Sequence, residues 1–392
     1  MKEGLPDLRE IPSCIGGDPK SRRGIVVAKS IPAKKYGVTT GEPVSMALRK
    51  CPELVCVPGD FALFETCSRA FKKICASYAP VMESFSIDEV FLDMSGTEKI
   101  YPDPVKLACE IKDRIREELG FTVNIGIGTN KLLAKMASDF EKPDKVHTLF
   151  PAEIPTKMWP LPVRDLLFLG KASEQKLIKA GIKTIGEMAR YPETEIQRLL
   201  GEKTGHQLYE YANGRDDSPV RGEREEAKGY SAETTTEEDI VTYEQAFSLL
   251  LAQCDVVAAR MRKDGKKCSC VSVTYRMLDF RTRSHQKKLG NPTDVTEEIF
   301  VQVKNLLYEC WQCQPLRLIG VALTDLTSDD FRQMSLFENT ENHEKQKKVD
   351  GVVDDIRKRF GNGMIVRGST MNTAGQVARK VKAQMELRDK NS

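Results

Sequence analysis

The sequence contains no apolar run of the roughly 20 residues that a membrane-spanning helix requires. Its N-terminal segment, MKEGLPDLREIPS, also lacks the apolar stretch that is typical of a secretion signal. The chain is therefore predicted to be cytoplasmic, and its 11 cysteines are expected to be reduced thiols. These absences argue against a membrane protein and against a disulfide-stabilised secreted domain.

Histidine is scarce, and neither sign of charge is in large excess. The four histidines are dispersed along the chain, at His147, His206, His285 and His343. A histidine-based metal site or catalytic triad is therefore not expected. The cysteine pairs in CSC (268–270) and CWQC (310–313) resemble half of a zinc site, but a strand face and a helix explain them more simply. Because the net charge is only +3, a nucleic-acid surface would have to come from local basic clusters.

The composition is that of a globular protein with a sizeable core. The chain has 392 residues, of which 40% are hydrophobic and 30% are charged, so two to four domains are expected. Helical spacing of apolar residues begins at Leu63, and the run 81–95 has β character. An amphipathic helix is predicted over 103–119 and a strand over 121–128, with Thr129 placed to cap the next helix. This order matches a split βαββαβ unit whose first strand is missing.

The sequence pattern of the second half of the chain predicts two further domains. Two short helical patterns surround AGI (180–182), with the spacing of a helix-hairpin-helix, whose backbone amides can hold a DNA phosphate. The charged stretch 221–229 reads as a linker. Beyond it a strand (268–278), a helix (293–311) and a strand (316–326) predict a small α+β domain. A polar tail begins at Thr327, and a charged amphipathic helix is predicted within it at 345–361.

Two adjacent acids, Asp88 and Glu89, lie inside the otherwise apolar run SFSIDEVFLDMS (84–95). Neighbouring side chains of a regular strand point to opposite faces, so the two carboxylates can converge only at a bend or hairpin tip. Carboxylates that close repel each other unless a cation lies between them, and hard oxygen ligands select Mg²⁺. Two such ions about 4 Å apart can catalyse an in-line phosphoryl displacement. The alternative is an acidic pair that caps a surface turn.

Lysines occur in three segments near this acidic run in the predicted order. PAKKYG (32–37) places Lys34 and Lys35 in a loop just after a strand, where triphosphate oxygens could be held. Lys131 and Lys135 lie one helical turn apart, and Lys142 follows the same helix. Each cluster alone is also compatible with a solvated surface.

Two of these motifs are similar to those of a known family. SIDEVFLDMSG and VNIGIGTNKLLAKMASDFEKP closely resemble the Y-family lesion-bypass DNA polymerases of bacteria, and the resemblance extends from residue 6 to about residue 335. It implies an α+β, multidomain right hand with a ferredoxin-like palm and inserted small fingers, a helix-hairpin-helix thumb and an α+β little finger. The expected boundaries are 1–12 and 61–158 for the palm, 13–60 for the fingers, 159–220 for the thumb, 221–231 for the linker, 232–327 for the little finger and 328–392 for the tail.

The resemblance assigns roles to individual residues. Asp88 and Glu89 match two catalytic metal-binding carboxylates, and Lys142 matches a lysine that contacts the incoming triphosphate. Lys34, beside Lys35, stands where the family usually has an arginine, and Ile31 where it usually has a tyrosine. These two differences weaken the contact expected between the fingers and the nucleotide, because lysine cannot make the bidentate contact of arginine.

DNA and clamp contacts are implied as well. The residues expected to hold DNA phosphates are Gly170, Lys171 and Gly181 in the thumb, and Arg281, Arg283, Lys287 and Lys288 in the basic strand 281–288, with a further basic stretch at 260–267. The thumb segment FLGKAS (168–173) lacks one glycine that is usual there. The segment QMSLF resembles the peptide by which bacterial polymerases dock on the sliding clamp. It consists of Gln333, Met334, Ser335, Leu336 and Phe337.

The largest difference from the family's pattern is at the start of the chain. The family has a first palm strand, with another metal-binding aspartate and an aromatic residue that excludes ribonucleotides, just before the segment that begins here at Leu5. The chain begins at Met1, so the expectation is an N-terminally truncated member that coordinates the catalytic metals poorly. Palm residues such as Ile125 and Ile127 should also be less covered.

The sequence therefore predicts a low-fidelity polymerase for translesion synthesis in SOS-type DNA repair. Two Mg²⁺ ions, primer–template DNA, deoxynucleoside triphosphates and the sliding clamp are the expected cofactors and partners of a monomer without membrane contact. The alternative is a non-catalytic DNA- and clamp-binding adaptor with a polymerase-like fold. A nuclease is disfavoured, because the lysines suit a triphosphate better than water activation.

Overall fold

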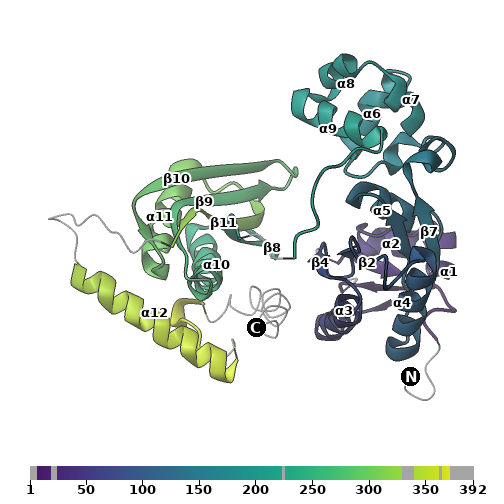
Figure 1. Cartoon of the computed structure of the whole chain (residues 1–392). Coiled ribbons are helices and arrows are strands. Elements are labelled where there is room, and N and C mark those ends of the chain that lie inside the picture. The colour runs from purple at the N-terminus through teal and green to yellow at the C-terminus, as the bar shows by residue number, and fades with distance from the viewer. Residues whose placement is uncertain (1–6, 19–23, 223–225, 329–339, 362–363, 371–392) are drawn as a thin grey trace. The chain divides into compact units, whose positions relative to one another are not determined.

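The structure, a computed structural model, describes residues 7–18, 24–222, 226–328, 340–361 and 364–370 (Figure 1). The chain divides into two compact units, one of Leu63–Glu225 and one that combines Met1–Ala62 with Glu226–Ser392. Among the described residues, no helix is both long enough and apolar enough to span a membrane.

The first segment of the chain forms a small three-stranded sheet with two short helices. The strands are β1 (Ser13–Gly16), β2 (Val26–Lys29) and β3 (Val55–Val57), in the order β2-β1-β3, and the helices are α1 (Ile31–Lys35) and α2 (Val44–Lys50). β1 runs antiparallel to β2 and parallel to β3. The Ser30 side chain caps α1 by accepting a hydrogen bond from the Ala33 N–H. The prediction of a loop at 32–37 was therefore wrong, since Lys34 and Lys35 end this capped helix.

Residues 61–149 have the predicted order of helix, hairpin, helix and strand. The elements are α3 (Phe61–Ala76), β4 (Val81–Ser84), β5 (Val90–Asp93), α4 (Pro104–Leu119), β6 (Ile125–Gly128), α5 (Lys131–Ser138) and β7 (Val146–Leu149). α4 begins where predicted, because the Asp103 carboxylate accepts from the N–H groups of Val105 and Lys106. α5 is capped by Asn130 instead of the predicted Thr129, since the Asn130 side chain reaches the Leu133 N–H at 2.9 Å.

The strands of this region form two separate pairs. β4 pairs antiparallel with β5, and β6 pairs parallel with β7. α3 and α4 share one apolar core with side chains of both pairs, including Val90, Leu92 and Ile125. Every residue of β5 and β6 is only partly buried, Ile125 and Ile127 among them.

A helical bundle follows in the same unit. It consists of α6 (Lys171–Lys179), α7 (Ile185–Arg190), α8 (Glu193–Leu200) and α9 (Glu202–Ala212), preceded by short 3-10 and π turns between Pro151 and Asp165. Its core includes Leu132, Leu133 and Met136 of α5. Helix α5 is therefore part of two layers at once, the bundle core on one face and the β6–β7 strands on another.

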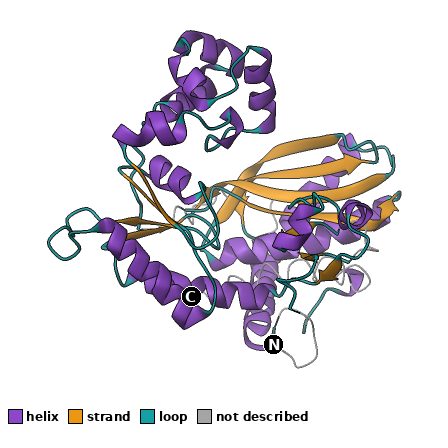
Figure 2. Cartoon of the chain, turned by 90° about the vertical axis from the view of Figure 1, so that its right-hand side faces the viewer, coloured by secondary structure: helices purple, strands orange, loops and turns teal. Residues whose placement is uncertain are grey.

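The second unit contains a four-stranded antiparallel sheet with two helices packed on one face. Its elements are β8 (Tyr230–Ile240), α10 (Tyr243–Lys263), β9 (Lys267–Met277), β10 (Thr282–Thr293), α11 (Thr296–Cys310) and β11 (Leu316–Thr327). The strand order is β10-β9-β11-β8, and Figure 2 shows these strands as one curved sheet. In β9, Val271, Val273 and Tyr275 alternate into the core while Ser272 and Thr274 occupy the other face.

The predicted C-terminal helix is α12 (Thr340–Phe360), and acidic side chains of this helix bond to α10 and α11 of the same unit. The buried Asp350 carboxylate accepts from the Thr296 N–H at 2.8 Å and pairs with Arg262 and Arg367. Asp354 also pairs with Arg262, at 2.7 Å. Arg262 belongs to the basic stretch 260–267 that was expected to face DNA, so that part of the expectation was wrong for this residue, whose guanidinium is enclosed by acids.

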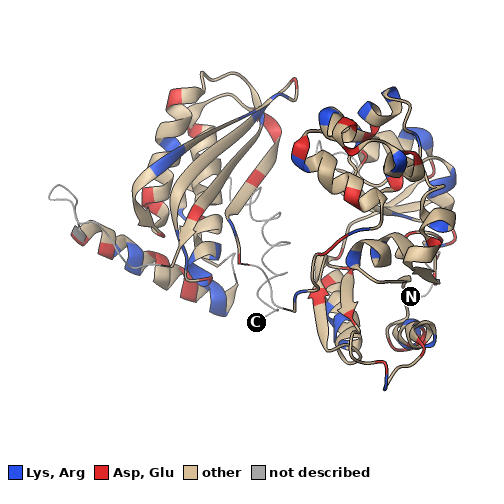
Figure 3. Cartoon of the chain, turned by 45° about the horizontal axis from the view of Figure 1, so that its top comes forward, with Lys and Arg blue, Asp and Glu red and all other residues tan. Residues whose placement is uncertain are grey.

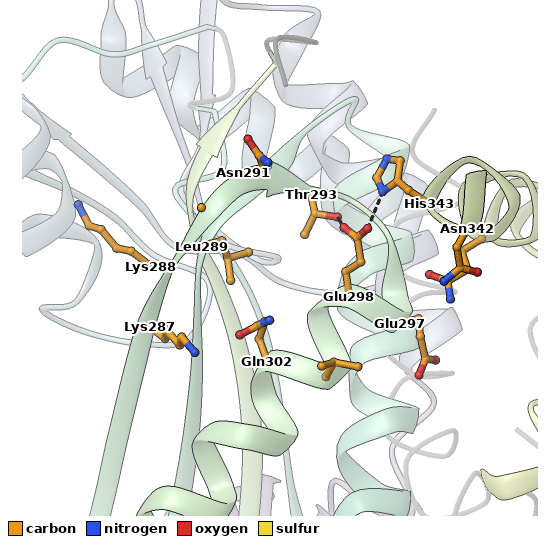
Figure 4. A pocket seen from close by; sticks show the side chains of 13 residues that line it. Lys287, Lys288, Leu289, Asn291, Thr293, Glu297, Glu298, Gln302, Asn342 and His343 are labelled. Carbon is orange, nitrogen blue, oxygen red and sulfur yellow. Dashed lines mark hydrogen bonds and ion pairs between the residues drawn. The ribbon is translucent and has the colours of Figure 1, made fainter. Parts of the chain in front are cut away.

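A pocket of about 640 Å³ lies between the end of β10, α11 and α12 (Figure 4). Glu298 stands in it and links two elements, because it accepts from Thr293 Oγ1 at 2.5 Å and lies 2.6 Å from His343 Nδ1 of α12. These contacts add to the ion pairs that fix α12.

Candidate functional site

The two predicted acids lie at the tip of the β4–β5 hairpin. The turn is closed by the N–H groups of Phe85 and Ser86, which donate to the Glu89 carbonyl at 3.0 and 3.1 Å. The Ser86 hydroxyl donates to Asp88 Oδ1 at 2.7 Å and so orients the exposed Asp88 carboxylate. The bend that the sequence required for adjacent acids is therefore present.

Helix α3 fastens this hairpin tip to the layer beneath it. The Ser68 hydroxyl donates to the Ile87 carbonyl, and Lys72 Nζ donates to the Ser86 carbonyl at 2.7 Å. Burial lowers the pKa of Lys72, although the nearby Asp88 carboxylate opposes that shift. Neither Ser68 nor Lys72 was singled out from the sequence, because the helical spacing of α3 gives no sign of which polar residues face the hairpin.

An ion-pair network joins the hairpin tip to the segment that carries Lys142. Lys135 Nζ of α5 lies 2.7 Å from Glu89 Oε1 and 2.8 Å from Asp139 Oδ2. The other oxygen of Asp139 lies 2.7 Å from Lys142 Nζ. The structure thus brings together Glu89 and Lys142, two of the predicted site residues, and it adds Asp139, which the sequence interpretation passed over although it lies in the same motif.

Lys135 and Asp139, at the centre of this network, shift each other's pKa. Burial disfavours the charged form of Lys135, but the hydrogen bonds to Asp139 and Glu89 outweigh it and raise the Lys135 pKa. Burial likewise opposes the charged form of Asp139, and the bonds from Lys135 and Lys142 outweigh it, so the Asp139 pKa is lowered. Both groups are therefore charged at neutral pH.

A second lysine of α5 reaches the other strand of the hairpin. Lys131 Nζ lies 2.8 Å from both carboxylate oxygens of Glu83 in β4, and 5.2 Å from the centre of the Phe91 ring in β5. The two lysines predicted to lie one turn apart thus both face the hairpin, and each is paired with an acid of β4, β5 or their turn.

The carboxylates were tested as ligands for a divalent ion. Asp88 and Glu89 offer hard oxygen donors on consecutive residues, which suits Mg²⁺. Within the described parts of the chain, no cluster of three or more His, Cys, Asp or Glu side chains is placed to hold a metal. Two carboxylates alone do not complete a Mg²⁺ site, so oxygens of a nucleotide or of water would have to supply further ligands.

The remaining predicted nucleotide contacts belong to the other unit. Lys34 and Lys35 are exposed in the last turn of α1. Their predicted role at the triphosphate stays a prediction.

The predicted thumb residues lie at the start of α6 and in the turn between α6 and α7, and their contact with DNA stays a prediction. Gly170 is the residue before α6, Lys171 is the first residue of that helix, and both are exposed. Gly181 has φ +86° between α6 and α7, a conformation that glycine adopts without strain. No side chain or backbone atom lies within 4 Å of where a Cβ of Gly170 would be, so its backbone is open to approach.

The predicted basic strand is β10, an edge strand paired with β9. Arg281, Arg283, Lys287 and Lys288 are all exposed. Arg281 pairs with Asp279 at 2.5 Å, and Lys288 lies 3.8 Å from Asp325. Figure 3 shows basic residues interspersed with acidic ones over both units, in keeping with the low net charge.

The predicted clamp peptide, Gln333, Met334, Ser335, Leu336 and Phe337, lies outside the described residues. In the chain it falls between β11 and α12.

Comparison with protein families gives three matches along the chain. Residues 2–139 match the impB/mucB/samB family, residues 227–336 match its C-terminal domain, and residues 164–216 match the thumb domain of DNA polymerase-iota. The matches thus cover the hairpin site, the four-stranded unit and the helical bundle.

Curated relatives are similar over nearly the whole chain. A protein named DNA polymerase IV from Clostridium acetobutylicum is 42% identical over 92% of this chain and 90% of its own length. DNA polymerase IV 2 from Bacillus subtilis is 34% identical over 95% of this chain and 91% of its own length.

Solved structures share the fold. The Y-family DNA polymerase chimera Dbh-Dpo4(243-245)-Dbh has a TM-score of 0.71 with 22% identity, covering 81% of this chain and 92% of that one. DinB from Sulfolobus solfataricus has a TM-score of 0.53 with 23% identity, covering 80% and 91%. Together with the sequence relatives, these likenesses confirm the α+β right-hand architecture with a helix-hairpin-helix thumb, and the chain belongs to the Y family of DNA polymerases.

Proposed function

We propose that the chain is a DNA-directed DNA polymerase that copies damaged templates, as expected from its family and its relatives named DNA polymerase IV. The observation that supports this function best is the network from Glu89 through Lys135 and Asp139 to Lys142. It connects a carboxylate suited to a metal with a lysine suited to a triphosphate. Phosphoryl transfer needs mainly this kind of positioning and charge from the protein.

Asp88 and Glu89 would hold the catalytic Mg²⁺ ions. Members of this family use divalent metal ions, and two such ions would neutralise the phosphates and activate the primer hydroxyl. Lys135 holds the Glu89 carboxylate toward α5, because its Nζ donates to Glu89 Oε1 at 2.7 Å. Lys142, with 58% of its side chain exposed, remains accessible to triphosphate oxygens beyond its pairing with Asp139. Lys34 and Lys35 would add charge from the fingers.

Primer extension on a template with an abasic site tests this proposal. Asp88→Ala should abolish nucleotide addition because the exposed carboxylate is a proposed metal ligand. The matched control is Glu117→Ala, which removes an exposed carboxylate from the outer face of α4 and should extend primers like the wild type. Unchanged extension by Asp88→Ala would exclude a metal role for this residue.

DNA binding separates the polymerase from the adaptor alternative. Asp88→Ala should bind primer–template DNA as the wild type does, so that lost extension reflects lost chemistry. An adaptor would show no extension in either form, with DNA binding intact in both.

The sliding clamp is the second proposed partner. Adjacent apolar residues Leu336 and Phe337 in a polar segment suit insertion into an apolar pocket. Deletion of residues 333–337 should leave extension on bare DNA unchanged and remove stimulation by the clamp. Equal stimulation of the deleted and full-length chains would contradict the docking role.

A further inference from the structure

Two cysteines lie against each other in the small sheet of the fingers segment. Cys14 in β1 and Cys56 in β3 are direct partners in the parallel register of these strands. Their sulfur atoms are 3.4 Å apart, although the residues are 42 positions apart in the chain. Cys14 is 2% exposed, whereas Cys56 is only partly buried.

From this juxtaposition we propose that Cys14 and Cys56 form an oxidisable dithiol, a modification site that a peroxide converts into a disulfide across β1 and β3. This proposal does not depend on the polymerase function. Both cysteines are free thiols in the structure.

The backbone geometry already suits the bond. Directly paired residues of neighbouring strands have Cα atoms roughly 4.8 Å apart, which lies inside the range of about 4.4–6.8 Å seen for disulfides. Paired residues also project their side chains to the same side of the sheet. Closing the contact to the S–S distance of about 2.05 Å requires the sulfurs to move together by roughly 1.4 Å, which side-chain rotation can supply without strand displacement.

The unequal exposure of the two thiols assigns their roles. Cys56 is the less buried residue of the two, so we assign it the first reaction. Its thiolate attacks one peroxide oxygen, the O–O bond breaks, Cys56 becomes a sulfenic acid, and the leaving hydroxide takes up the proton that the Cys56 thiol has lost, giving the first water. Cys14 Sγ then attacks Cys56 Sγ, the S–S bond forms, the S–O bond breaks, and the departing hydroxide takes up the Cys14 proton as water. In sum, two thiols lose two electrons and one hydrogen peroxide is reduced to two waters.

Burial, with the contact to Cys56 as a second cause, raises the pKa of Cys14 to about 12. The Cys14 thiol is therefore a poor first target for the oxidant. Its packing in the apolar core with Val26, Ala33 and Val44 also shields it from solvent. Cys14 thus serves as the internal partner that captures oxidised Cys56 before further oxidation.

The bond would join the entry of the fingers segment to its exit. β1 precedes and β3 follows the part of the chain that contains β2, α1 and α2. Oxidation therefore closes this part into a covalent loop that includes Lys34 and Lys35. A cross-link of this kind restricts the unfolded ensemble of the loop.

The test is oxidation of the full-length chain with hydrogen peroxide, alkylation of remaining thiols, and digestion without reductant by trypsin and a glutamate-specific protease. Cleavage after Glu53 separates Cys56 from the nearby Cys51, and cleavage after Glu65 separates it from Cys67. The expected product is a linked pair of peptides, residues 11–20 and 54–65, with two fewer alkylated thiols per chain than the reduced protein. Dithiothreitol should release both peptides.

Variants sharpen the result. Cys14→Ser should remove the linked pair and let Cys56 proceed to sulfinic acid, while Cys51→Ser should leave the link intact. If the wild-type chain gave Cys56 as sulfinic acid, or as a bond between two chains, while Cys14 was still alkylated, the proposal would be overturned. This outcome is read from the wild type alone, so it does not depend on whether a variant folds.

Discussion

The hairpin site and the edge strand β10 use basic residues in opposite ways. At the hairpin, Lys131 and Lys135 are largely buried and each is held by an acid at 2.7–2.8 Å. On β10, Arg283, Lys287 and Lys288 are exposed, and the pair between Lys288 and Asp325 is long, at 3.8 Å. Held charges position a reacting group, whereas solvated charges attract a polyanion without fixing it. The two regions should therefore fail differently when their charges are removed.

The largest effect is expected at the hairpin. Glu89→Gln keeps the size of the side chain but removes the charge that Lys135 and a metal ion would share. Extension should fall by more than about 100-fold, because both a ligand and its positioning are lost. Glu117→Gln on the exposed face of α4 is the matched control. A loss below threefold for Glu89→Gln would show that the held charges of this region do not matter for chemistry.

A smaller loss of activity is expected for Lys135, which positions Glu89. Lys135→Met should lower kcat by about 10- to 100-fold, the usual range for an outer partner of a liganding group. Lys135→Arg should recover part of that loss, since it keeps the charge between Glu89 and Asp139. A purely structural role for Lys135 predicts instead lower thermal stability of Lys135→Met with an unchanged kcat.

A weaker, salt-dependent effect is expected on β10. Lys287→Ala/Lys288→Ala should bind duplex DNA roughly tenfold less tightly at moderate salt and reduce the slope of log K against log salt by about 1.8. The control is Lys345→Ala/Lys348→Ala, two exposed lysines of α12. If the β10 variant had a lower kcat at saturating DNA, its exposed lysines would act in catalysis as well as in binding, and the proposed difference between the two regions would be contradicted.

The smallest expected effect is a change in how the thermal stability depends on pH, caused by the ion pairs of Asp139 with Lys135 and Lys142. The folded-state pKa of Asp139 is lowered from its usual 3.8, so its contribution to stability is present above that value and is lost as the pH falls through the folded pKa. The Lys135 pKa is raised, so its contribution is lost only well above neutrality. Asp139→Asn should therefore lower Tm at pH 7, and this Tm difference from the wild type should shrink as the pH is lowered below 3.8. A Tm difference that stayed the same over this range would contradict the linkage.

Much of the site was predictable because it is encoded locally. The bend at Asp88 and Glu89 was expected from an acidic pair inside an apolar run and is present. Lys142 was singled out by the resemblance to the family, and its role at the triphosphate stays a prediction. The capping residue of α5 was misassigned because Thr129 and Asn130 are both good caps, and only the backbone decides between them. The α1 helix was missed because Pro32 after a strand suggests a loop, whereas proline is equally suited to a first helical turn.

Contacts between distant parts of the chain were beyond this kind of reasoning. The pairing of Arg262 with Asp354 spans 92 positions, and no local pattern distinguishes it from a solvated charge. The same holds for the packing of α12 and for the meeting of Cys14 with Cys56. These pairings depend on strand register and domain packing, which a periodicity argument does not supply.

The double membership of helix α5 has a mechanical consequence. Leu132, Leu133 and Met136 of this helix belong to the same apolar core as the bundle, while Lys131 and Lys135 of the same helix pair with Glu83 and Glu89. We therefore expect a displacement of the bundle core to shift the two ammonium groups relative to Glu83 and Glu89, because one short helix carries both sets of contacts.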